Sequence, residues 1–193
     1  MPRFVVLLRG VNVGKGKRVP MADLRDLLAG LGFSAVRTVL NSGNAVVDAA
    51  GGRADDHADA IAAALLERLG VATPVVVKTA AEWTRIVRGN PMVPPEAEHG
   101  RFLVAFGRTP EDVRSLTPLE TLARGRDRLA ISDEAAYLHG PGGIAASELT
   151  AAVLGKAGRR VTTRNWATVR KLDGLVREGE PAEGEAGETS DTC

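Results

Sequence analysis

The sequence predicts an α+β fold in which the order strand, helix, strand, strand, helix, strand occurs twice. Two observations predict it. Over the first 78 residues, short β-branched runs alternate with segments of helical hydrophobic period, and a similar order follows a proline-rich stretch at 90–100. Each half therefore has the split-βαβ, or ferredoxin-like, order with an antiparallel sheet.

The first half is predicted from changes in hydrophobic period. The continuous apolar run Val5–Leu8 indicates a buried strand, and helical spacing then begins at Met21. The letters "NSGN" between two β-branched runs are a strong hairpin signal, and the proline that opens the last strand favours a sheet edge. The predicted elements are a strand at 5–8, a helix at 21–31, strands at 34–40 and 45–49, a helix at 58–69 and a strand at 74–78.

The second half repeats the topology without repeating the residues. The predicted elements are a helix at 80–88, a strand at 101–107, a helix at 110–123 interrupted at Pro118, a hairpin at 127–140, a helix at 146–156 and a final helix at 164–176. We therefore predict a first ferredoxin-like half at 1–78, a helix and proline-rich connector at 79–100, a second half with the C-terminal helix at 101–176, and a disordered acidic tail at 177–193.

Charge is distributed unevenly along a chain whose net charge is +1. The tail has one arginine against six acids, a net charge of −5, which leaves 24 cations and 18 acids, or +6, for the rest. A basic body attracts anionic partners at long range. The sequence therefore favours a phosphate-bearing small molecule or a nucleic acid as partner.

The single cysteine, Cys193, excludes an internal disulfide framework and is typical of a protein in the reducing cytoplasm. No apolar run is long enough to cross a bilayer, so we expect no membrane partner. His57, His99 and His139 are scattered without metal-ligand spacing, and we expect neither metal nor cofactor. The sequence has no nucleophile elbow, and catalytic residues stay unassigned.

The glycine-rich loop "RGVNVGKGKR" is the first candidate site. In a split-βαβ sheet, the loop that leaves the first strand and the hairpin that joins the next two emerge at the same end, which places this loop beside "NSGN". Glycines turn the backbone and direct N–H groups outward, and cations near a helix start favour a phosphate or carboxylate. The loop supplies Arg9, Gly10, Asn12, Gly14, Lys15 and Lys17 as ligand-binding candidates, and the hairpin supplies Ser42, Gly43 and Asn44.

Neither nucleotide-binding fingerprint fits this loop. Lys15 stands where a P-loop needs its second glycine, and Val19 stands where a dinucleotide-binding loop needs its third. A solvated basic turn therefore remains an alternative explanation of the loop.

A second basic segment, "KAGRRVTTRNWATVRK", adds Arg164 and Asn165 to the candidates. Thr162 or Thr163 is the expected cap of the helix that follows, with Arg164, Asn165 and Thr168 on its neighbouring turns. Trp166 is expected to pack in the core instead of stacking on a base.

Four blocks, "LLRGVNVG", "PMADLRDLLAGLGF", "TVLNSGNAVVD" and "TTRNWATVRKL", closely resemble the bacterial domain of unknown function 1697 family over residues 3–175. The resemblance implies two ferredoxin-like halves and supplies no activity. Family members tend to have a second glycine at the position of Lys15.

Three functions follow from these features. The first is binding of a phosphate-bearing ligand, a nucleotide or RNA, at the loop 9–18 and the hairpin 41–44. The second is an enzyme that acts on a phosphorylated small molecule, with cations stabilising negative charge. The third is a structural or interaction module without a small-molecule site. The oligomeric state does not follow from the sequence.

Overall fold

The computed structural model describes residues 1–14, 16–143 and 146–178. The first half contains strands β1 (Arg3–Leu8), β2 (Ser34–Thr38), β3 (Asn44–Asp48) and β4 (Val75–Thr79), with helices α1 (Met21–Gly30) and α2 (Ala54–Leu69). Helix α3 (Ala80–Arg88) and a 3₁₀ turn, η1 (Glu96–Glu98), lead to the second half. There, strands β5 (Phe102–Phe106), β6 (Arg128–Ile131), β7 (Ala135–His139) and β8 (Thr162–Asn165) accompany α4 (Pro110–Arg114), the 3₁₀ helix η2 (Thr117–Leu122), α5 (Glu148–Leu154) and the final helix α6 (Trp166–Arg177).

The strands form two separate antiparallel sheets. Their orders are β2-β3-β1-β4 and β6-β7-β5-β8, which is the predicted split-βαβ topology in both halves. The proline-led strand β4 lies at a sheet edge, as expected. The predicted α+β fold is therefore confirmed, whereas the boundaries at residues 78, 100 and 176 stay a prediction. The expected acidic tail lies outside the described residues from position 179 onward.

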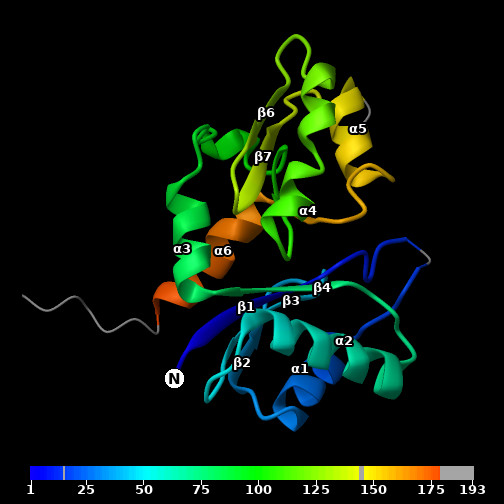
Figure 1. Cartoon of the computed structure of the whole chain (residues 1–193), viewed down its shortest axis with the longest axis vertical. Coiled ribbons are helices and arrows are strands. Elements are labelled where there is room, and N and C mark those ends of the chain that lie inside the picture. Colours follow the sequence, from blue (N-terminus) through cyan, green and yellow to red (C-terminus); the bar gives the residue numbers. More distant parts are fainter. Residues whose placement is uncertain (15, 144–145, 179–193) are drawn as a thin grey trace, which may run out of the picture.

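The two sheets pack through a central helical layer. Helices α3 and α6 lie between them, and α6 contacts β1 and β3 of one sheet and β5 and β8 of the other (Figure 1). Side chains from both sheets and both helices make one shared core, in which Trp83 and Trp166 are buried. The predicted packing role of Trp166 is confirmed, because its ring also meets that of Phe102 edge-on at 5.8 Å. The outer sheet faces are covered by α1 and α2 in the first half and by α4 and α5 in the second.

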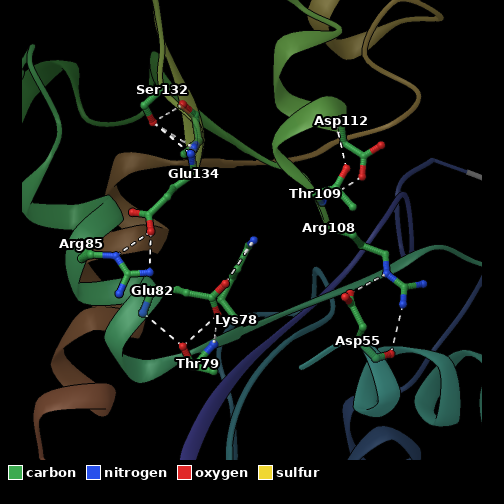
Figure 2. A network of polar contacts seen from close by, with 11 residues as sticks. Asp55, Lys78, Thr79, Glu82, Arg85, Arg108, Thr109, Asp112, Ser132 and Glu134 are labelled. Atoms are coloured by element: carbon green, nitrogen blue, oxygen red, sulfur yellow. Dashed lines mark hydrogen bonds and ion pairs between the residues drawn. The ribbon is translucent and has the colours of Figure 1, made fainter. Parts of the chain in front are cut away.

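Polar contacts also join the halves. Arg108, just after β5, extends to Asp55 at the start of α2, and its Nε lies 3.3 Å from Asp55 Oδ1 (Figure 2). Helix α3 begins with a capping box, in which the Thr79 hydroxyl accepts the Glu82 N–H and Glu82 accepts the Thr79 N–H (Figure 2). The central core and the Arg108 contact thus fix one half against the other.

The predicted final helix begins too early. Residues 162–165 are strand β8, which pairs with β5 in register from Leu103↔Asn165 to Phe106↔Thr162. The unpaired edge of β5 explains the difference, because it offers backbone partners to this segment that a helix would leave unused. Helix α6 starts at Trp166, and Asn165 caps it by accepting the Thr168 N–H at 2.9 Å. The expected capping role of Thr162 or Thr163 is therefore wrong. Among the described residues, no helix is long and apolar enough to span a bilayer.

Candidate functional site

The loop after β1 and the β2–β3 hairpin lie side by side, as the topology predicts. Leu8 N–H donates to Gly43 O at 2.8 Å, and the Asn12 side-chain amide donates to Asn41 O at 2.7 Å. Both segments face the second half, because the Arg164 side chain on β8 donates to backbone oxygens of Leu8 and Ser42. Segments more than 100 residues apart in sequence therefore build one surface.

A cleft of about 680 Å³ opens between the two halves at this place. This volume lies within the range of about 300–1,000 Å³ that is typical of small-molecule sites. One wall comes from the first half and the other from α5, β8 and the start of α6. The lining residues are Arg9, Gly10, Val11, Val13, Lys17, Ser42 and Pro74 on the first wall, and Val153, Leu154, Gly158, Val161, Thr162, Thr163, Arg164, Asn165 and Thr168 on the second.

Two cations at the first wall have no carboxylate partner among the described residues. An Arg9 Nη1–H donates to the backbone oxygen of Arg159, and Lys17 Nζ donates to that of Ala72. These bonds hold both side chains at the wall but neutralise neither charge, and both groups keep further N–H donors. Since cations and no acidic residue of the described chain line the cleft, the electrostatic potential within it is positive.

Arg164 is a buried cation with another role. Its side chain is bonded at every nitrogen: Nε donates to Asn44 Oδ1, Nη1 to Thr162 Oγ1 at 2.9 Å and Thr163 O at 2.7 Å, and Nη2 to Leu8 O at 2.6 Å and Ser42 O at 3.1 Å. Burial lowers the pKa of Arg164 to about 10, so the group stays charged at neutral pH. Arg164 therefore joins the two halves and adds positive charge to the cleft, while its donors are occupied by the protein.

The loop itself is closed by the side chain of Asn12, which has a left-handed backbone with φ of 57°. Its amide donates to Val19 O and Asn41 O, both at 2.7 Å, and its carbonyl accepts the Val19 N–H at 2.9 Å. All of these groups are thus bonded to the protein, and Asn12 shapes the loop without lining the cleft.

The hairpin is held in the same way by Asn44, which is fully buried. Its amide donates to Val39 O and to Ser42 Oγ, both at 2.9 Å, and its carbonyl accepts from Arg164. Gly43 has a φ of 71°, and an added Cβ would lie 2.7 Å from Leu8 Cβ and from Val11 Cγ2. The hairpin needs glycine here for both its backbone conformation and its close approach to β1.

The structure thus divides the sequence-predicted residues into two groups. Those that line the cleft are Arg9, Gly10, Lys17, Ser42, Arg164 and Asn165, and those that do not line it are Asn12, Gly14, Gly43 and Asn44. Lys15 lies outside the described residues. Sequence reasoning missed Val13, Pro74 and the whole α5 contribution, because no local pattern indicates which segment of one half faces the other.

The cleft carries few groups suited to acid–base or metal chemistry. Within the described ranges, its lining has no Asp, Glu, His or Cys, and no cluster of three such side chains suits a metal ion anywhere. His139 lies on β7 with Nε2 2.6 Å from Glu98 Oε2, and neither residue lines the cleft. The arrangement is suited to holding an anion.

The fold is similar to that of the conserved bacterial protein SP0830 from Streptococcus pneumoniae, with a TM-score of 0.72 and 19% sequence identity over 91% of this chain and 98% of that one. A likeness at this identity shows a shared fold alone. No curated protein matches the sequence. The family model described as "Protein of unknown function (DUF1697)" matches residues 1–137. The chain therefore belongs to the DUF1697 family.

Proposed function

We propose that this protein binds a phosphate-bearing ligand in the cleft between its halves, with Arg9 and Lys17 as the contacting cations. The observation that carries the proposal is the charge of the lining, which has three cations and, among the described residues, no acid. Hydrogen bonds between an ionised donor and a phosphate are about twice as strong as neutral ones. The start of α6 adds the positive end of a helix dipole beside Asn165 and Thr168.

A small ligand is better supported than RNA. Sequence-specific RNA recognition stacks unpaired bases on aromatic or guanidinium planes. In the described chain, no Phe, Tyr, Trp or His lines the cleft, and the guanidinium of Arg164 is fully bonded and buried. Binding is proposed in preference to catalysis because the described lining supplies no general acid or base other than its cations. A cytoplasmic location and a bacterial origin remain proposals from the sequence.

The test is calorimetric titration with inorganic phosphate, ribose 5-phosphate, AMP and a short RNA, at low and at physiological salt. We expect at least one small phosphate to bind at physiological salt. We expect Arg9→Ala to weaken the binding of that phosphate about 10- to 100-fold, because a charged hydrogen bond contributes about 1.5–3 kcal/mol. Arg126→Ala is the matched control, since it removes the same charge from an exposed residue outside the cleft.

The outcomes separate the explanations. Equal weakening by Arg9→Ala and Arg126→Ala would mean that only the overall charge attracts anions. Binding that disappears at physiological salt would likewise leave a basic surface without a specific site. The absence of binding by all the probes would contradict the proposal and favour a structural role for the loop.

A further inference from the structure

Apolar residues line the cleft beside its cations, and two of them are exposed. Val13 has 67% of its surface exposed and Leu154 has 40%, which places both among the six large hydrophobic residues that are exposed in the described chain. Single exposed hydrophobic residues need no explanation. These two, however, line the same cleft from opposite walls, and Pro74, Val153 and Val161 line it with them.

The backbone around both residues is tightly specified. Val13 follows the left-handed Asn12, whose N–H donates to Lys17 O at 2.7 Å, and Val13 O accepts the Gly16 N–H at 3.2 Å. Non-glycine residues in a left-handed conformation are concentrated at functional sites, although Asn adopts it more readily than most. The loop therefore holds Val13 at the rim through hydrogen bonds within its own backbone.

The opposite rim is fixed by a close backbone approach. Leu154 ends α5, and the chain then folds back so that a Cβ at Gly158 would lie 1.8 Å from the carbonyl oxygen of Val153. This contact leaves no room for a side chain at Gly158. Leu154 thus stands on a wall whose path depends on a glycine that itself lines the cleft.

We propose that the ligand is a small phosphate monoester bearing a compact apolar group, and this inference rests on the proposed phosphate-binding function. The phosphate lies against Arg9 and Lys17, and the apolar group lies between Val13 and Leu154. Apolar surface on both sides removes the ligand's own apolar surface from water, which a bare phosphate or a polyanion cannot exploit. A cleft of about 680 Å³ limits this group to the size of a small molecule.

The test compares phenyl phosphate, ribose 5-phosphate, inorganic phosphate and a hexanucleotide RNA by calorimetric titration of the full chain at physiological salt. Phenyl phosphate and ribose 5-phosphate share the phosphate but differ in the polarity of the attached group. We expect phenyl phosphate to bind about tenfold tighter than ribose 5-phosphate, the effect of burying a few apolar carbons. The double variant Val13→Ser/Leu154→Ser should lose this preference, because it should weaken the binding of phenyl phosphate more than that of ribose 5-phosphate.

Leu66→Ser is the matched control, because Leu66 is 56% exposed on α2 and does not line the cleft. It should leave both affinities unchanged, and the unfolding midpoints of all variants show whether each is folded. Equal affinities for the two monoesters, a preference that survives the double variant, or tighter binding of the RNA would each overturn the inference. If Arg9→Ala still weakens ribose 5-phosphate in those cases, the proposed function stands. Failure of every phosphate to bind would overturn both.

Discussion

Replacement of the buried guanidinium of Arg164 by a methionine should destabilise the protein strongly. Arg164 is 8% exposed, and the described chain places no carboxylate in an ion pair with it. Its nitrogens donate instead to oxygens on both halves, including Leu8 O and Asn44 Oδ1 of the first half. Arg164→Met keeps an unbranched side chain of similar length but leaves these acceptors without a donor.

The magnitude follows from the groups that lose their partner. Each buried polar group left unpaired costs about 1–3 kcal/mol, so Leu8 O and Asn44 Oδ1 together cost about 2–6 kcal/mol. Removal of the buried charge recovers part of this, because the desolvation of an ion costs several kcal/mol. We therefore expect Arg164→Met to lower the free energy of unfolding by about 3 kcal/mol. The free energy of unfolding of Arg164→Lys should lie between that of the wild type and that of Arg164→Met, since an ammonium keeps the charge but cannot reach the same set of acceptors.

Urea denaturation at equilibrium, followed by fluorescence of the buried Trp83 and Trp166, measures this change. Arg160→Met is the control, because Arg160 is about half exposed and pairs with Asp112 at the surface, where such pairs contribute about 0–1 kcal/mol. Burial lowers the pKa of Arg164 only to about 10, so the loss should be the same at pH 6 and pH 8. A loss for Arg164→Met no larger than that for Arg160→Met would refute the view that this side chain joins the halves.

Two further predictions concern the hairpin and the first strand. Gly43→Ala should lower the free energy of unfolding by about 2–4 kcal/mol, because of the left-handed backbone and the contact with Leu8. Gly14→Ala is the control, since Gly14 has a similar φ of 57° and open space around its Cβ, and it should lower the free energy of unfolding by only about 1–2 kcal/mol. Equal losses in the two urea titrations would disprove the contact. The hydrogen bond from Arg3 lowers the pKa of Asp48 below its ordinary value of 3.8. The ionised Asp48 therefore contributes stability that is fully present above pH 3.8 and is lost as the pH falls through the lowered pKa. The stability difference between the wild type and Asp48→Asn should thus be constant at neutral pH and shrink in acid, and a difference independent of pH would contradict this.

The sequence by itself determined the order of the elements in the first half and, in the second half, every strand except β8. Hydrophobic period, the proline before β4 and the "NSGN" hairpin are local signals, and they were enough to place the first loop beside the hairpin. Such signals depend on which backbone conformations and faces nearby residues prefer, so they do not require knowledge of the partner half. The same local reasoning failed at residues 162–165, where a free strand edge on β5 outweighed the helical pattern.

Only the tertiary structure decided the composition of the cleft. Arg9 and Arg164 look alike in the sequence as arginines beside turn residues, yet one lines the first wall with donors to spare and the other is buried with its donors bonded. Val13 and Leu154 are 141 positions apart in the chain and carry no signal that they share a site. Their presence in one cleft depends on how the two sheets pack across α3 and α6. That packing is set by contacts summed over the whole central core, which no short segment encodes.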